Sequence, residues 1–183
     1  MLKESENPPV SWPEEKSIND FTGSWWVAHT KSRNEKALAQ DLIAKAISYF
    51  LPMTWKVRRQ RGRTIRSLLP LFSGYLFFCM TGEKQRLKVL QTNRVANLIE
   101  VKDQQRLLAE LLQIEQALQA GALLVPHRYI KAGQHCKVIA GPLADLHGIV
   151  VKTKTAARLV LQIDMLGQAA SVEIDTNMIE LLD

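Results

Sequence analysis

The clearest candidates for chemistry are the six cations of the segment 56–66, KVRRQRGRTIR, which contains no acidic residue. They are Lys56, Arg58, Arg59, Arg61, Arg63 and Arg66. Guanidinium groups donate paired hydrogen bonds to phosphate oxygens, and neutralised phosphates release condensed counterions, which favours association. The segment therefore predicts a surface for nucleic-acid phosphates, without readout of particular bases. A solvated basic hairpin that binds nothing is the alternative interpretation.

The other reactive residue types do not form a recognisable catalytic or metal-binding set. Four of them, His127, His135, Cys136 and His147, invite comparison with a zinc site. Adjacent residues of a strand point to opposite faces, however, and the sequence has no CxxC or HxxxH pair. It also lacks the GxSxG, Walker and Rossmann glycine patterns. We therefore expect no catalytic residue, no metal and no cofactor.

The elements that would position the cations begin with a strand and a helix. Aromatic and β-branched residues predict a strand over 24–30, and apolar spacing predicts a helix over 33–46. Ser32 and Glu35 have the spacing of a capping box at the start of this helix. Further elements are predicted as a helix at 83–92, a strand at 95–101, and a helix at 103–121 with Asp103 as N-cap and Gly121 at its end.

The cationic segment is predicted at the tip of a hairpin that turns at Gly62 and projects into solvent, because it offers nothing to a core. An almost uncharged run, LLPLFSGYLFFCM, follows directly at 68–80. Within this run Leu76 and Phe78 are predicted as core residues that face the helix over 33–46. The run therefore joins an exposed arm to a buried strand.

The last third of the chain reads as short strands separated by glycine-containing turns, with no helix after His135. This pattern predicts a small barrel of about 50 residues. Period-two alternation places Leu159, Leu161, Ile163 and Met165 on its core side. The same alternation places Leu166 on the polar side, where a single exposed leucine is either unremarkable or a partner contact.

Together these elements predict an α+β chain of two domains. An N-terminal α/β sandwich-like domain, with a mixed sheet and flanking helices, is expected over 23–120. A small all-β barrel is expected over 132–183, after a linker over 121–131. Residues 1–22, which are acidic and contain Pro8, Pro9 and Pro13, are predicted to be a disordered tail.

Charge is distributed in blocks along the 183 residues. Residues 1–20 carry a net charge of −3, residues 21–131 carry +11 and residues 132–183 carry −2. A basic block between acidic ends predicts a polyanion-binding surface on one domain and a different partner for the other. Two cysteines, no signal-peptide pattern and no long apolar run favour a cytoplasmic protein that does not engage a membrane.

Four blocks of sequence, in order, resemble the NusG-like transcription factors. WWVAHTKSRNEKALAQDL and PLFSGYLFF resemble the first strand and helix, and the central strand, of the NusG N-terminal domain. GPLADLHGIVVK, which contains Gly148, resembles the KOW motif, and MLGQAASVEIDTNMIELL resembles the end of the KOW domain, an SH3-like barrel. The blocks cover most of residues 24–183, and their order makes the resemblance more specific than a KOW motif alone.

This resemblance implies a transcription elongation or antitermination factor that travels on RNA polymerase. The N-terminal domain would bind the clamp helices of the largest subunits, close to non-template DNA or nascent RNA. The KOW domain would recruit a small-subunit ribosomal protein or Rho. We expect the factor itself to be a monomer. A ribosome-associated or RNA-associated KOW protein that does not act on polymerase is the alternative.

The chain departs from the housekeeping NusG pattern at two places. NRVANLIEV stands where a glycine-rich segment is expected, and Ser73 stands where proline is usual. These departures are similar to those of specialised paralogues of the RfaH type. Whether the KOW domain also switches its fold, as in RfaH, stays open, although the alternation of RLVLQIDML favours strand.

The resemblance also implies roles for individual residues. The polymerase-binding positions would be Phe72 and Tyr75, with Trp25 or Trp26 as a wall of the same apolar surface, although core packing is the alternative for Phe72. His29 and Thr30 resemble a polar motif that some RfaH-type proteins use on the opposite side of the polymerase cleft. In the KOW domain, the partner-binding residues would be Met165, Leu166 and Gln168.

Overall fold

The computed structural model describes residues 6–60, 62–152 and 156–182. The chain divides into two compact units, residues 1–108 and residues 109–183. The boundary falls inside one helix, α3 (Gln104–Gln119).

Unit 1 is built on a five-stranded sheet with the order β1-β3-β6-β2-β7. Its strands are β1 (Ser11–Trp12), β2 (Ser24–Thr30), β3 (Tyr49–Phe50), β6 (Tyr75–Met80) and β7 (Val95–Glu100). Every neighbouring pair is antiparallel, so the predicted mixed sheet is wrong. β2 and β3 run in the same direction but do not pair, because β6 lies between them. This is a split β-α-β arrangement.

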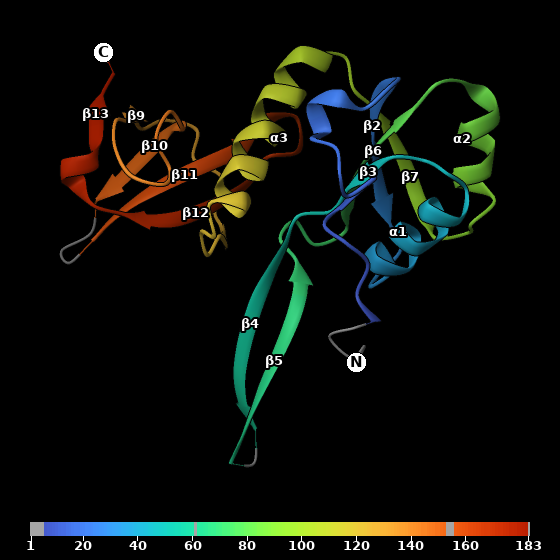
Figure 1. The fold of residues 1–183 in the computed structure, drawn as a ribbon, viewed down its shortest axis with the longest axis horizontal. Coiled ribbons are helices and arrows are strands. Elements are labelled where there is room, and N and C mark those ends of the chain that lie inside the picture. The colour runs from blue at the N-terminus through green and yellow to red at the C-terminus, as the bar shows by residue number, and fades with distance from the viewer. Residues whose placement is uncertain (1–5, 61, 153–155, 183) are drawn as a thin grey trace. The chain divides into compact units, whose positions relative to one another are not determined.

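Two helices cover one face of this sheet (Figure 1). From α1 (Glu35–Ala44), Leu38 and Leu42 are buried, and from α2 (Glu83–Leu90), Val89 is buried, all in one cluster with Leu76 and Phe78 of β6. The prediction that Leu76 and Phe78 are core residues facing the first helix is confirmed. The strand at 95–101 and the helix at 83–92 were also predicted correctly to within two residues.

The opposite face of the sheet carries residues at the alternate positions. Trp25 and Val27 of β2 lie opposite Cys79 and Phe77 of β6, and all four side chains are buried. Burial raises the pKa of the Cys79 thiol to about 12, which keeps the thiol neutral near pH 7. Both faces of this sheet are therefore packed, as the apolar run of 68–80 requires.

The predicted disordered tail is wrong for residues 6–22. β1 extends the sheet by pairing with β3, and the short 3-10 helix η2 (Ile18–Asp20) buries the Ile18 side chain completely. The ring of Phe21 stacks on Trp25, with centroids 5.8 Å apart. The prediction of disorder relied on the acidic and proline content of the segment and gave too little weight to its apolar residues. Burial of these residues offsets the entropy cost of ordering the segment.

The cationic segment forms the predicted hairpin. β4 (Met53–Gln60) and β5 (Arg63–Pro70) pair with each other in a separate two-stranded sheet. Figure 1 shows this ribbon extending away from the five-stranded sheet. Gly62 has φ +75°, the left-handed conformation that tight hairpin turns require and glycine adopts at little cost.

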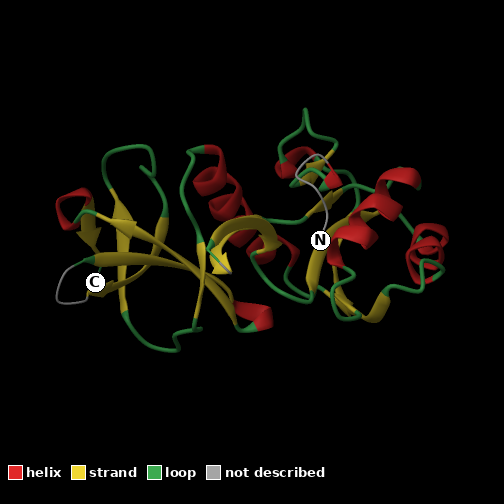
Figure 2. Cartoon of the chain, turned by 90° about the horizontal axis from the view of Figure 1, so that it is seen from below, coloured by secondary structure: helices red, strands yellow, loops and turns green. Residues whose placement is uncertain are grey.

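Unit 2 is built on a six-stranded antiparallel sheet with the order β13-β9-β10-β11-β12-β8. Figure 2 shows strands of this unit in yellow, beside the end of the chain marked C. The strands are β8 (Val125–His127), β9 (Gln134–Val138), β10 (His147–Lys152), β11 (Ala157–Ile163), β12 (Gln168–Ile174) and β13 (Ile179–Leu181). Short 3-10 helices, η3 (Asp164–Leu166) and η4 (Thr176–Met178), stand before and after β12. The predicted β-rich C-terminal part is present.

Part of the predicted linker over 121–131 belongs to this sheet. Val125–His127 is the strand β8, which pairs with β12, and the carbonyl of Ile130 accepts a hydrogen bond from Gln162. The apolar pair Leu123–Leu124 gave a hint, since Leu124 is buried. Short edge strands such as this one carry too few residues for periodicity to reveal them.

The predicted domain boundary after residue 120 also differs from the structure. In unit 2, the α3 side chains of Gln113 and Gln116 hydrogen-bond the backbone of His147 and Ala144. The helix itself was predicted correctly, with Asp103 accepting a bond from the Arg106 N–H and Gly121 beyond its end at φ +75°. Within the described residues, no helix is long and apolar enough to cross a membrane.

Candidate functional site

The hairpin presents its cations on both of its faces. In the β4–β5 register, Gln60 pairs with Arg63, and each earlier residue of β4 pairs with a later residue of β5. Paired residues share a face, and successive pairs alternate. One face therefore carries Lys56, Arg58 and Arg63, and the other carries Arg59 and Arg66. Arg61, the sixth predicted cation, lies outside the described residues.

These five cations form no ion pair within the described part of the chain that would compete with a bound anion. No acidic residue occurs between 53 and 70. The guanidinium of Arg66 lies 5.0 Å from the ring centroid of Trp55, a cation–π contact on the same face of the hairpin. Trp55 was not among the predicted site residues, although period-two spacing from Val57 and Arg59 places it on the face that carries Arg59 and Arg66.

A second feature is the tight loop between β5 and β6. Gly74 has φ +86°, and its carbonyl accepts a hydrogen bond of 2.8 Å from the N–H of Thr30. The N–H of Gly74 donates a hydrogen bond of 2.7 Å to the carboxylate of Glu35, a residue that is 6% exposed. The predicted capping box is therefore wrong: Asn34 is the N-cap of α1, and Glu35 braces this loop instead.

We expect replacement of Glu35 by alanine to destabilise unit 1 by about 1–3 kcal/mol, because the partly buried Gly74 N–H loses its acceptor. Glu35→Gln is the matched control, since its amide oxygen can still accept. Chemical denaturation of both variants measures the difference. Equal loss in both would show that the carboxylate charge, rather than the hydrogen bond, is what matters.

An aromatic pair lies beside this loop, where β6 begins. Tyr75 of β6 and His29 of β2 face each other across the strands, with ring centroids 5.2 Å apart and an interplanar angle of 27°. The Tyr75 side chain is half-buried and that of His29 is exposed. The structure therefore brings together two of the predicted contact residues as an accessible patch.

The register separates the remaining predicted contact residues. Trp26 and Thr30 alternate with His29 and lie on the opposite face, where Trp26 packs against the core beneath α1. Thr30 is buried, and its hydroxyl has no hydrogen-bond partner among the described residues. The prediction that Trp26 joins the apolar surface around Tyr75 does not agree with this geometry. The burial of Thr30 likewise does not agree with its predicted polar contact on the opposite side of the polymerase cleft.

Two further predicted contacts, Phe72 and Trp25, are buried. Phe72 is 2% exposed and packs edge-on against Phe77, with centroids 6.1 Å apart, while Trp25 is 4% exposed beneath Phe21. The core alternative left open for Phe72 is the one this structure shows. Neither ring is presented to a partner in this conformation, because packing inside unit 1 occupies both.

In unit 2 the three predicted partner-binding residues lie together at the β11–β12 turn. The 3-10 helix η3 contains Met165 and Leu166, and Gly167 follows in the left-handed conformation before Gln168 begins β12. The helical turn breaks the predicted alternation: Met165 is 41% exposed instead of facing the core, and Leu166 is half-buried.

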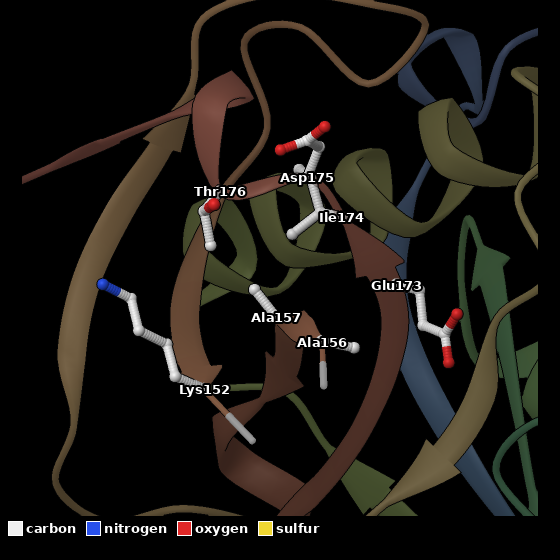
Figure 3. Close-up of a pocket in the computed structure, with 7 residues that line it drawn as sticks. All are labelled: Lys152, Ala156, Ala157, Glu173, Ile174, Asp175 and Thr176. Atoms are coloured by element: carbon white, nitrogen blue, oxygen red, sulfur yellow. The ribbon is translucent and has the colours of Figure 1, made fainter. Parts of the chain in front are cut away.

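Unit 2 also contains a hollow of about 560 Å³, with walls from β10, β11 and the end of β12 (Figure 3). Its lining residues are Lys152, Ala156, Ala157, Glu173, Ile174, Asp175 and Thr176. Figure 3 shows Lys152 and Glu173 on opposite sides, and Glu173 already accepts a hydrogen bond from Arg158. This arrangement does not converge polar groups on a common point, so we assign no site to it.

Comparisons with known proteins bear on unit 1 in particular. The family described as "Transcription termination factor nusG" matches residues 23–115, just over half of the chain. Among solved structures, the "Crystal Structure of MjSpt4:Spt5 complex conformation B" is similar at 13% identity and a TM-score of 0.25, over 87% of this chain and 97% of that one. No curated protein matches. The family match shows that the chain belongs to the NusG family of transcription elongation factors.

Proposed function

We propose that the chain binds RNA polymerase during elongation through unit 1 and recruits a second partner through unit 2, acting as a binding factor rather than an enzyme. The observation that carries the proposal is the Tyr75–His29 pair, an accessible aromatic patch within the segment that matches the NusG family. On the same face of the sheet, the neighbouring side chains of Trp25, Val27 and Phe77 are buried, whereas this pair is accessible. A partner can reach it without unfolding the domain.

The chemistry of the patch suits an amphipathic helix of the polymerase clamp. Aromatic side chains contribute most at protein interfaces when a rigid neighbour supports them and polar groups surround them. Stacking on His29 supports Tyr75, and the hydrogen bond between Glu35 and Gly74 fixes the loop beside it. The surface is small, so we expect the hairpin to add affinity through nucleic acid held by the polymerase.

We further propose that unit 2 is an SH3-like KOW barrel that contacts a small-subunit ribosomal protein or Rho through the β11–β12 turn. An exposed methionine beside a half-buried leucine is an adaptable apolar contact at the end of a rigid strand pair. The departures at 93–101 and at Ser73 favour a specialised, RfaH-type factor over a housekeeping one.

Replacement of Leu166 by glutamate should weaken binding of the unit 2 partner by at least about tenfold, because a charge is placed in an apolar contact. Titration of the variant against the ribosomal protein and against Rho measures this loss. Met178→Glu is the control, since Met178 is exposed in unit 2 away from this turn. Unchanged affinity of Leu166→Glu for both partners would remove the residue from the site.

Affinity purification of the full chain tests the whole proposal. We expect the largest RNA polymerase subunits among the recovered proteins, retained after nuclease treatment because the Tyr75–His29 contact is with protein. Recovery of ribosomal subunits without polymerase would instead support a ribosome-associated KOW protein and would overturn the proposed role.

A further inference from the structure

The cations of the hairpin follow a regular order that the sequence alone does not display. Counting cross-strand pairs from the turn, five successive pairs each contain one cation: Arg63, then Arg59, Arg58, Arg66 and Lys56. Successive pairs point to opposite faces of the ribbon. The positive charge therefore alternates from one face to the other at every step and favours neither face.

We propose that the hairpin enters the major groove of duplex DNA and contacts both phosphate backbones, one with each face. The proposal rests on the proposed role of the hairpin in binding nucleic acid, and it specifies the form of nucleic acid. A single strand lying on a two-stranded ribbon meets one face only. It would leave either Arg59 and Arg66, or Lys56, Arg58 and Arg63, without phosphate.

The dimensions of the ribbon select the groove. A layer of sheet together with its side chains occupies about 10 Å, which fits the B-form major groove of about 12 Å but not the minor groove of about 6 Å. The major groove of A-form RNA is deep and narrow and does not admit the ribbon. The eight residues of each strand give a length of about 27 Å, enough to reach into the groove from outside.

The isolation of the ribbon supports this mode of binding. β4 and β5 pair with no third strand among the described residues, so both faces and both edges are accessible along the outer half. Val57, between Lys56 and Arg58, is 59% exposed, so the second face is open as well as the first. On this second face, the cation–π contact with Trp55 gives the Arg66 guanidinium a fixed neighbour.

The test compares two neighbouring residues that face opposite ways. Fluorescence anisotropy with the full chain measures affinity for a short mixed-sequence DNA duplex, its separate strands and the matching RNA duplex, each over a range of salt concentrations. We expect tightest binding to the DNA duplex. Arg58→Gln and Arg59→Gln should each reduce the slope of log affinity against log salt by about 0.9, the value for one lost phosphate contact. Lys84→Gln, on the exposed surface of α2, should leave the slope unchanged.

Three results would overturn the proposal. A slope change in only one of the two arginine variants would show that one face alone meets phosphate. Tighter binding to a single strand or to the RNA duplex would assign a different ligand. No binding to any of the three would remove nucleic acid from the hairpin altogether, while recovery of polymerase by the purification experiment would leave the polymerase role of unit 1 intact.

Discussion

Alanine in place of Tyr75 should weaken the proposed binding of this chain to RNA polymerase at least about thirtyfold and leave unit 1 folded. The ring is half-buried and stacks on His29, so it is the accessible part of an aromatic face whose other members are packed. Truncation of an aromatic residue at the centre of a small interface costs about 2–4 kcal/mol, which is at least a thirtyfold loss of affinity. Biolayer interferometry on polymerase or on a clamp-helix fragment measures this loss.

Two companion variants separate contact from stability. Tyr75→Phe keeps the ring and its stacking and should retain most of the affinity. Trp25→Ala removes a buried ring from the same face and should instead lower the melting temperature of unit 1. If Tyr75→Ala binds polymerase at full strength, the patch is not the polymerase site, and circular dichroism decides whether a loss of binding reflects unfolding.

Tyr75 and Phe72 differ in their exposure, and this difference could not be predicted from the local sequence. Both aromatic residues flank Ser73 and Gly74, so local composition treats them alike. Their difference comes from their partners in the fold: Phe72 packs against the edge of Phe77 and is buried, whereas Tyr75 stacks on the exposed His29 and stays half-buried. Contact residues can be nominated from sequence, but their exposure depends on packing that no local pattern contains.

The hairpin, by comparison, was largely predictable. Eighteen residues without an acidic side chain, interrupted by Gly62 and flanked by apolar segments, leave no arrangement except an exposed ribbon. Its register was not predictable in advance, since a shift of one residue moves every side chain to the other face. The alternation of single cations between the faces therefore emerged only from the observed pairing.

Glu35 illustrates a different limit. Its position three residues after Ser32 satisfied the spacing of a capping box, a local rule with a physical basis. The carboxylate instead accepts a hydrogen bond from the N–H of Gly74, 39 residues away in the sequence. A buried acceptor forms its hydrogen bond with a donor that the fold places beside it. Local sequence spacing cannot identify that donor when it lies far away in the chain.

Substitution of Gly148 by alanine should strongly destabilise unit 2. A Cβ at this position would lie 2.5 Å from the carbonyl oxygen of Val160 and 2.9 Å from Cδ1 of Leu159. Val160 belongs to β11, which pairs with β10 immediately beyond Gly148, so the oxygen cannot move without disrupting that pairing. This close approach of two strands is the physical reason for the glycine that the KOW-like segment contains.

We expect Gly148→Ala to destabilise unit 2 by about 3 kcal/mol, the upper part of the range for inserting atoms into a packed interior. Gly167→Ala is the control: its Cβ would meet nothing within 4 Å, so only its φ of +59° opposes alanine, at about 1 kcal/mol. Because the chain has two units, amide hydrogen exchange must assign the loss to residues 109–183. If Gly148→Ala were no more destabilising than Gly167→Ala, β10 and β11 could move apart enough to accommodate the Cβ at little cost. The close contact with Val160 would then not be the reason for a glycine at position 148.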